Sequence, residues 1–225
     1  MNFLQLCQRT ALECGVSRGT AGPVTVVSQT GELGNIVSWV ATAYEDIQDD
    51  STGWNFLRFD FSFQTIATTS TYLPSAVALP ELNKWKADSL RAYLTASGSS
   101  DEQWMTEWDW ATFRDARQFG AIPSGRPFEF AIKPDESLVL FPTPDDVYTV
   151  TGEYWKRPQV MTANTDEPLF DQTFHMAIVW KAVMYYAADQ GAAELYASAQ
   201  NEYRRIKDKM YFKYLPSFTL GEPLA

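Results

Sequence analysis

The most informative hydrophobic pattern lies in the second half of the chain. Residues 147–155 are rich in Val, Tyr and Thr, which favour a β-strand. Pro158 ends this strand because proline has no N–H for a sheet hydrogen bond. Residues 174–188 then carry apolar side chains all around a helix, so this helix has to be enclosed by other elements. It is shorter than the roughly 20 apolar residues of a membrane span and contains His175 and Lys181. The pattern therefore predicts the core helix of a soluble domain.

Three further segments have the 3.6-residue repeat of amphipathic helices. The first covers residues 2–14, with Gly15 as its C-terminal stop. The second follows Thr30, a predicted N-cap, and ends at residues 49–53. The last covers residues 192–214, and its basic residues gather near its C-terminus, where they favour the helix dipole. The apolar stripes are Phe3, Cys7, Ala11 and Cys14; Leu33, Ile36, Val37, Val40, Tyr44 and Ile47; and Leu195, Ala199, Tyr203, Ile206 and Met210.

The middle of the chain has the two-residue period of β-strands. Apolar and polar residues alternate strictly over residues 57–64, which predicts a half-buried strand with Leu57, Phe59, Phe61 and Phe63 facing inward. Turn residues between the later strands indicate that these strands form antiparallel hairpins with the strand at 147–155. The other predicted strands lie near Tyr72, at 89–94, at 128–132 and at 138–141.

These elements predict an α+β fold. We expect a helical bundle made by the N- and C-terminal helices, over residues 1–53 and 157–215, with an inserted antiparallel β-rich region at 54–156. Residues 216–225 follow as an extended C-terminal tail. The tail is too short to fold alone and too apolar for a simple solvated end, so we expect it to dock on a neighbouring protein.

Residues 101–119 support two interpretations. In the first, the segment from about Glu107 to Phe119 forms a helix that packs aromatic side chains against the sheet. In the second, Trp104 and Trp108 form a sugar-binding subsite, and the nearby carboxylates of Glu107 and Asp109 act as acid and base. Indole rings mostly serve cores and interfaces, which favours the first interpretation.

Composition and charge exclude several classes of protein. The chain has 225 residues, of which 45% are hydrophobic, so it can form a packed core. Its net charge of −10 gives it no electrostatic attraction to nucleic-acid phosphates. Cys7 and Cys14 are seven residues apart on one helix and too distant to form a disulfide, which predicts free thiols in a reducing compartment. The start of the chain has no signal-peptide pattern, so we expect synthesis in the cytoplasm.

No catalytic or metal-binding motif is present in the sequence. The single histidine, His175, falls within the core helix, where it is expected to be a hydrogen-bonded buried or interface residue rather than a catalytic base. The glycines at 15, 19 and 22 lack the Lys-Ser/Thr ending of a phosphate-binding loop. Neither Cys-x-x-Cys nor His-Glu-x-x-His occurs. We therefore expect no catalytic residues, no metal and no cofactor, and by elimination an interaction protein.

Several segments resemble the head-to-tail adaptor (connector) proteins of tailed bacteriophages. The likeness covers nearly the whole chain in the same order, and its motifs are structural rather than catalytic. The segments that carry it are Phe3-Leu4-Gln5-Leu6-Cys7, Gly31-Glu32-Leu33, Trp39 to Tyr44, Trp54-Asn55-Phe56-Leu57-Arg58, Gly152 to Thr162, Asp166-Glu167-Pro168 and Phe174 to Val179.

The resemblance implies a structural, non-enzymatic role. Such proteins form a ring, commonly of twelve copies, beneath the portal protein of the DNA-filled capsid. The ring offers a docking platform for a tail component and lines the DNA exit channel, where it meets DNA transiently and without sequence specificity. The expected location is therefore the head-to-tail interface of the virion, with no membrane partner. A stopper or tail-completion ring is the alternative within this class, and only the neighbours in the particle distinguish the two roles.

Two sets of contact residues are predicted from the same resemblance and from the distribution of aromatic and basic residues. A ring subunit needs two different patches for its two neighbours, and aromatic residues are enriched at interfaces. For contact between subunits or with the tail we predict Trp104, Trp108, Phe119 and Phe141. For contact with the portal we predict Phe218 and Leu220 of the tail together with Lys209 and Lys213 of the last helix.

Overall fold

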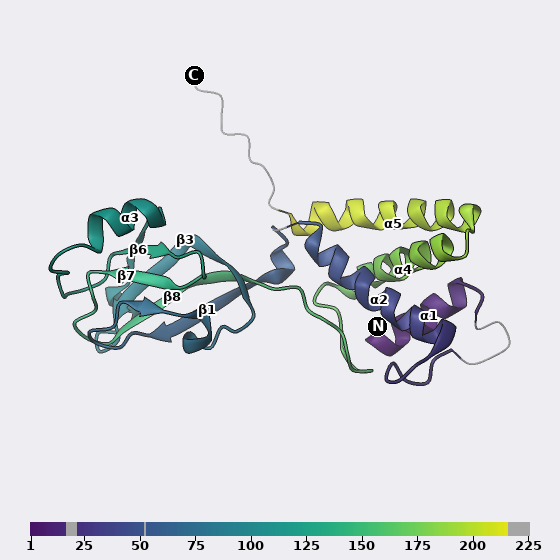
Figure 1. Ribbon diagram of the computed structural model, residues 1–225, viewed down its shortest axis with the longest axis horizontal. Helices are drawn as coiled ribbons and strands as arrows, with labels where there is room; N and C mark the ends of the chain where they lie inside the picture. Colours follow the sequence, from purple (N-terminus) through teal and green to yellow (C-terminus); the bar gives the residue numbers. More distant parts are fainter. Residues whose placement is uncertain (17–21, 52, 216–225) are drawn as a thin grey trace, which may run out of the picture. The chain divides into compact units, whose positions relative to one another are not determined.

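The computed structural model describes residues 1–16, 22–51 and 53–215, and the chain within them forms two units (Figure 1). The first unit is α-helical and contains the residues up to Leu57 and those from Pro158 onward. The second unit is mainly β-sheet and contains Arg58–Arg157. The prediction of an α+β fold, with terminal helices that flank a β-rich region, is confirmed.

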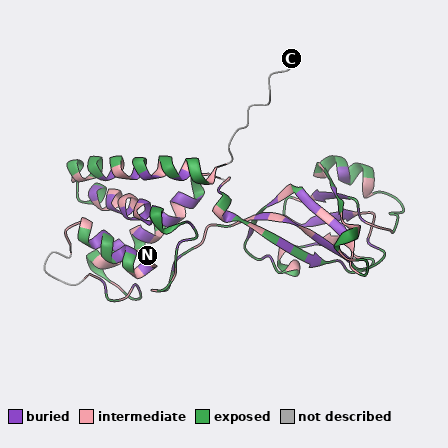
Figure 2. Ribbon diagram, turned by 180° about the vertical axis from the view of Figure 1, so that it is seen from behind, coloured by how far each residue is buried: buried purple, intermediate pink, exposed green. Residues whose placement is uncertain are grey.

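In the α-helical unit, one helix is enclosed by the others. Helix α4 contacts α1, α2 and α5 (Figure 1). Figure 2 shows that α4 is buried or half-buried along most of its length, as its apolar sequence predicted. The side chains of Ala177, Ile178, Val179, Ala182 and Val183 are all fully buried. The helices are α1 (Phe3–Glu13), α2 (Gly31–Asp49), α4 (His175–Asp189) and α5 (Ala193–Tyr214).

The ends of α1 follow its sequence signals, whereas the start of α2 does so only in part. Asn2 and Gln5 form a capping box at the start of α1, in which each side chain accepts a hydrogen bond from the other residue's backbone N–H. Gly15 follows α1 with a φ of 75°, a left-handed conformation that favours glycine. Thr30 occupies the N-cap position of α2 as predicted, but its side chain forms no capping hydrogen bond. The entry into α2 therefore depends on packing more than on a cap.

Polar contacts join α2 to α4 and α5. Tyr185 of α4 donates a hydrogen bond to the carboxylate of Asp46 in α2. Tyr203 of α5 donates to Asp50, just after α2, at 3.0 Å, and the ammonium group of Lys207 lies 2.8 Å from the same carboxylate. Burial and the Asp50 charge raise the pKa of Tyr203, so its hydroxyl remains a proton donor. These directional bonds fix the register of the helices, whereas apolar contacts alone are not directional.

The β unit, in which the structure describes every residue, contains two sheets. The first sheet has the strand order β1 (Arg58–Gln64), β8 (Tyr148–Lys156), β3 (Leu82–Leu94) and β4 (Gln103–Trp104). The second has the order β2 (Thr71–Tyr72), β7 (Leu138–Phe141), β6 (Glu129–Ile132) and β5 (Thr106–Trp108). Short 3-10 helices complete the described elements at Asn55–Leu57, Pro74–Val77, Ser99–Asp101 and Gln172–Phe174.

One hydrophobic core lies between the two sheets. Alternate residues of the strands contribute to it, which is the burial pattern of two sheets packed face to face. Gly152 of β8 is paired with Phe61 of β1, and a Cβ atom at position 152 would lie 2.9 Å from the Phe61 ring. Glycine is therefore required there for close packing. The core residues include Phe61, Phe63, Tyr72, Leu82, Trp85, Leu90, Phe130, Leu138, Leu140 and Val150.

Helix α3 (Trp110–Arg117) covers the outer face of the second sheet. Phe113 of α3 is buried against Ala131 of β6 and Val139 of β7, which point away from the central core. The expectation that this helix packs against the sheet is confirmed. Its predicted start is wrong, because the residues before Trp110 form β4, β5 and the N-cap Asp109.

Strand pairing differs from the sequence prediction in two ways. Strands β6 and β7 form an antiparallel hairpin as predicted, but β8 lies in the other sheet, between β1 and β3, and does not pair with β7. Strand β5 pairs with β6 in parallel, so the β-rich region is not entirely antiparallel. In addition, β3 begins at Leu82, earlier than the predicted strand at 89–94, and is interrupted by register shifts.

Candidate functional site

The described residues contain no side-chain arrangement typical of a metal centre. No group of three or more His, Cys, Asp or Glu residues is placed to hold a metal ion in the part of the chain that the structure describes. Cys7 and Cys14 are free, as predicted, and burial is the main reason that the pKa of both thiols is raised to about 12. A thiol with so high a pKa is a poor nucleophile at neutral pH. Neither thiol is therefore a candidate nucleophile.

His175 is buried and both of its ring nitrogens have a hydrogen-bond partner. It is buried at the start of α4, and its Nε2 atom lies 3.1 Å from the carbonyl oxygen of Phe170. Its Nδ1 atom lies 2.8 Å from the amino group of Met1. A neutral ring that donates from Nε2 and accepts at Nδ1 satisfies both contacts. The prediction of a hydrogen-bonded buried histidine is confirmed.

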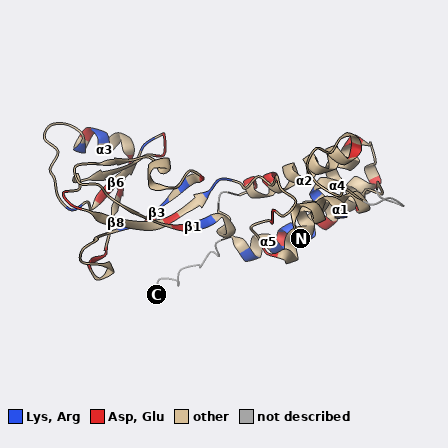
Figure 3. Ribbon diagram, turned by 90° about the horizontal axis from the view of Figure 1, so that it is seen from below, with Lys and Arg blue, Asp and Glu red and all other residues tan. Residues whose placement is uncertain are grey.

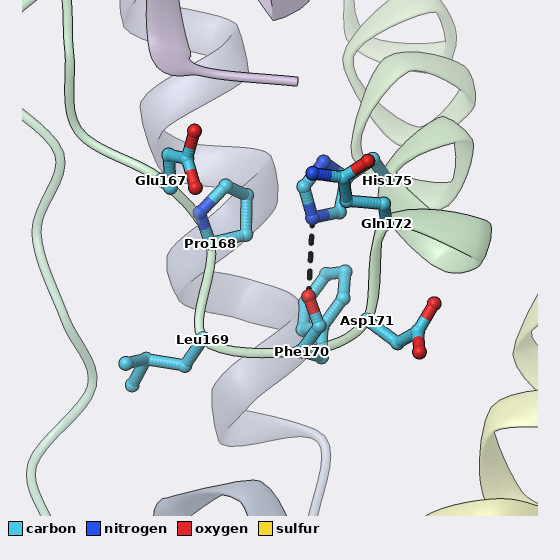
Figure 4. Close-up of a pocket in the computed structure, with 7 residues that line it drawn as sticks. All are labelled: Glu167, Pro168, Leu169, Phe170, Asp171, Gln172 and His175. Carbon is cyan, nitrogen blue, oxygen red and sulfur yellow. Dashed lines mark hydrogen bonds between the residues drawn. The ribbon is translucent and has the colours of Figure 1, made fainter.

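An open pocket of about 460 Å³ lies beside His175 (Figure 4). Figure 4 shows that the loop before α4 forms most of its wall, with His175 at one side. Asp171, at its edge, accepts hydrogen bonds from the backbone and hydroxyl of Thr173 and pairs with Lys213 at 3.1 Å. These contacts lower the pKa of Asp171 to about 2. A carboxylate engaged in this way stabilises the loop and is not suited to general acid or base catalysis near neutral pH.

We expect acidification to destabilise the α-helical unit through His175. Burial lowers the pKa of His175 in the folded chain below the ordinary value of about 6.5. Below about pH 6.5 the unfolded chain therefore binds a proton that the folded chain does not bind. The free energy of unfolding does not depend on the charge of His175 above this pH. It decreases as the pH falls below about 6.5, with a slope of at most about 1.4 kcal/mol per pH unit. Urea unfolding between pH 7.5 and pH 5.5 measures this slope.

The variant His175→Gln provides the control, because it removes the chain's only histidine and retains an amide donor. The other charged groups near the ring are the amino group of Met1 and the carboxylate of Glu167. Asp171 stays ionised throughout the tested pH range because its pKa is about 2. A slope that is unchanged in His175→Gln would show that another group is responsible.

The four aromatic residues predicted as contacts on the β unit divide into two pairs. Trp104 and Phe119 are 66% and 73% exposed, so both are available to a partner. Trp108 and Phe141 are half-buried, and the guanidinium of Arg117 lies 4.9 Å from the centre of each ring. Trp108 and Phe141 therefore form part of the packing of α3, and the structure brings these two together but not all four.

Arg117 organises this part of the β unit. Its Nε and Nη2 atoms donate to the two carboxylate oxygens of Glu129 in β6 at 2.8 and 3.1 Å. This two-point ion pair, together with the two aromatic rings, holds α3 on the sheet. The hydrogen bonds that Arg117 donates to Glu129 raise the pKa of its guanidinium above the ordinary value. The sequence pattern predicted a helix against the sheet here, but neither the pairing of Arg117 with Glu129 nor its position beside two aromatic rings.

The sugar-binding alternative gains little support from the same region. Trp104 is exposed, but the guanidinium of Arg91 lies 5.2 Å from the centre of its ring. Asp109, the proposed second carboxylate, caps α3 by accepting a hydrogen bond from the backbone N–H of Thr112 at 3.1 Å. Glu107 is exposed, with no hydrogen-bond or ion-pair partner among the described residues. The residues do not converge on a cleft between two free carboxylates, which glycoside hydrolysis requires.

The C-terminal end of α5 contains the described part of the predicted portal contact. Lys209 is exposed, whereas Lys213 is paired with Asp171. Basic residues are frequent along this half of α5 (Figure 3). Phe212 is 91% exposed and is the most exposed large apolar side chain of the described residues. Phe218 and Leu220 lie outside the described residues.

Phe212 was missed by the sequence analysis, although a signal for it exists. The buried stripe of α5 contains Ala199, Tyr203, Ile206 and Met210, and Phe212 falls outside this stripe. An aromatic residue on the polar side of an amphipathic helix is left exposed to solvent. Such a residue is a candidate for contact with another molecule, because aromatic residues are enriched at interfaces.

A family model matches most of the chain. The family model described as "SU10 adaptor protein" matches residues 1–214. No curated protein matches the chain. No helix in the described residues has the length and apolar character that crossing a membrane would need.

Proposed function

This chain belongs to the SU10 adaptor protein family of bacteriophages, and from this premise we propose that it is a ring subunit that links the portal protein to the tail. In this role the protein is a structural component of the virion at the head-to-tail interface. It binds the portal on one side, a tail component on the other, and further copies of itself within the ring. The observation that carries the proposal is the family match, which extends over 214 residues and leaves out only the C-terminal end of the chain.

The exposed side chains of the described residues support a role in binding other proteins. Large apolar side chains are exposed on both units, with Trp104 and Phe119 on the β unit and Phe212 on the α-helical unit. Exposed aromatic residues of this kind are typical of protein interfaces. We propose no enzymatic activity and no cofactor.

The charge of the chain supports the further proposal that the ring lines the DNA exit channel. A net charge of −10 disfavours tight binding to phosphates, so DNA can pass without being retained. Contact with DNA is then transient and independent of sequence. An alternative role as a stopper or tail-completion ring differs only in the neighbours within the particle.

Two measurements test the proposed role. Cryo-electron microscopy of the virion should place the chain between portal and tail, in a ring with a copy number that the reconstruction gives directly. Binding of the purified full chain to the purified portal should occur without other phage proteins. A position on the capsid wall, or absence from the particle, would contradict the proposal.

We expect deletion of residues 216–225 to weaken binding to the portal by at least about tenfold, as loss of apolar anchor residues does at interfaces. The residues expected to carry the effect are Phe218 and Leu220. A second variant replaces both residues by Ser in the full-length chain, which keeps the length of the tail. Biolayer interferometry with immobilised portal measures the affinity of each variant. Undiminished binding by both variants would remove the tail from the portal contact and leave it to Lys209 and its neighbours on α5.

A further inference from the structure

Helix α5 carries an exposed aromatic side chain at its C-terminal end. Phe212 is 91% exposed, although its neighbours Tyr211 and Tyr214 both pack in the aromatic cluster around Trp54. Exposing a phenylalanine ring to water is unfavourable, because its apolar surface gains free energy on burial. This end of α5 therefore presents an apolar knob.

The opposite end of α5 has an apolar pocket. It has a volume of about 280 Å³ and lies where α4 ends and α5 begins. The volume is below the range of about 300–1,000 Å³ that is usual for small-molecule sites, which favours a single side chain as the occupant. Gly191, with a φ of 64°, turns the chain at this corner. The residues that line the pocket are Ala187, Ala188, Gly191, Ala193 and Tyr196.

The knob cannot reach the pocket of its own chain. Phe212 and Tyr196 are separated by 16 residues of one continuous helix, which corresponds to about 24 Å at 1.5 Å per residue. Phe212 of the same chain is therefore excluded as the occupant. A second copy presents the same phenylalanine without this restriction.

Acidic residues lie beside the pocket, and a lysine lies close to the phenylalanine. Asp189 and Glu194, next to the pocket in sequence, are exposed and have no ion-pair partner among the described residues. Lys209 lies one helical turn before Phe212 and likewise has no ion-pair partner within the described ranges. The nearby Asp208 has the opposite charge to Lys209, so the aromatic side chain rather than net charge has to supply most of the affinity.

We propose that Phe212 of one copy inserts into the pocket between α4 and α5 of a second copy. The contact is heterologous, because knob and pocket are different surfaces, and every added copy offers a new free knob and a new free pocket. Such contacts generate a ring when the rotation between copies closes. That this contact builds a ring at the portal rests on the proposed function. The contact between two copies does not depend on that function and can be tested separately.

The first experiment mixes two assembly-defective variants. Phe212→Ala removes the knob, and Ala193→Trp fills the pocket. Analytical ultracentrifugation of each purified full-length variant should show self-association weakened by at least about tenfold relative to the unmodified chain. A mixture of the two variants should form heterodimers and nothing larger, because only one intact knob and one intact pocket can meet. Failure of the mixture to form heterodimers contradicts the inference.

The matched control is Phe119→Ala, which removes an aromatic side chain of similar exposure from the β unit. It should leave self-association unchanged. An equal loss in this control would mean that exposed aromatic residues act nonspecifically, which also contradicts the inference.

The second experiment gives an answer even if the isolated chain is a monomer. A photoreactive benzoylphenylalanine replaces Phe212 in the full chain, and irradiation is carried out at high protein concentration and again with portal present. Mass spectrometry should identify crosslinks from position 212 to residues 187–196 of another copy. Crosslinks to the portal alone, or none to residues 187–196 under either condition, overturn the inference.

These outcomes separate the inference from the proposed function. If Phe212→Ala still binds portal and joins the ring, the knob contact is wrong but the adaptor role stands. If the crosslink to residues 187–196 forms but the chain does not bind portal, the self-contact stands and the adaptor role fails.

Discussion

Replacing Trp54 by Ala is expected to destabilise the α-helical unit by about 3–5 kcal/mol, the usual cost of removing a buried tryptophan. Trp54 is fully buried, and its ring stacks on Tyr211 of α5 at 5.3 Å with an angle of 8° between the planes. Its indole N–H donates to the carbonyl oxygen of Ile47 in α2 at 3.0 Å. The substitution leaves a cavity between α2 and α5 and an unpaired carbonyl group. Urea unfolding followed by far-UV circular dichroism measures the loss.

The variant Trp54→Phe separates the two contributions. It retains an aromatic ring beside Tyr211 but loses the hydrogen bond to Ile47, so we expect the smaller loss of about 1 kcal/mol. Trp104→Ala is the matched control, because Trp104 is mostly exposed and surface substitutions usually change stability by less than about 0.5 kcal/mol. Equal stability of Trp54→Ala and Trp104→Ala would contradict the packing described for α2 and α5.

Replacing Trp85 by Ala should have a comparable effect of about 3–5 kcal/mol, but on the β unit. Trp85 of β3 is buried in the core between the sheets, with its ring edge-to-face against Phe61 at 4.9 Å. Its indole N–H donates to the carbonyl oxygen of Glu136, in the turn between β6 and β7, at 2.8 Å. This side chain therefore joins the two sheets through both packing and a hydrogen bond.

Hydrogen–deuterium exchange with mass spectrometry locates the effect of each tryptophan variant. Trp85→Ala should accelerate exchange in β1, β3 and β8, and Trp54→Ala should accelerate it in α2 and α5. This separation follows because each unit has its own buried core. If the β strands of Trp85→Ala are as well protected from exchange as those of the unmodified chain, the two sheets do not share a core around Trp85.

The parts of the fold that the sequence predicted best have a strong period and a continuous buried face. The alternation at residues 57–64 predicted β1 because every second side chain enters the core. The apolar residues at 174–188 predicted α4 because helices surround it. In both cases local pattern and tertiary burial agree, so single-sequence reasoning is sufficient.

The errors arise where pairing is non-local or the pattern is irregular. Strand β3 begins at Leu82, but register shifts around Lys84 and Lys86 disrupt its alternation. Strands β4 and β5 contain only two and three residues, too few to show a period. The partner of β8 could not be predicted, because turn residues indicate where a strand ends but not which sheet the next strand joins.

The interaction residues show the same division. Trp104 and Phe119 were predicted as contacts and are exposed, whereas Trp108 and Phe141 are held by Arg117 and pack beside α3. The sequence shows that these residues are aromatic, but it does not show which neighbouring side chains cover them in the folded chain. Phe212 is exposed for the opposite reason, since it falls outside the buried stripe of a regular helix.

The antiparallel pairing of β1 with β8 places the first and last residues of the β unit side by side. Arg58 is paired with Trp155, and Lys156 is paired with Leu82 on the other side of β8. Neighbouring strands are only about 5 Å apart, so the polypeptide enters and leaves the β unit at almost the same point. The whole β unit is therefore a cassette that could be excised and replaced by a short turn, or exchanged for another domain with adjacent termini.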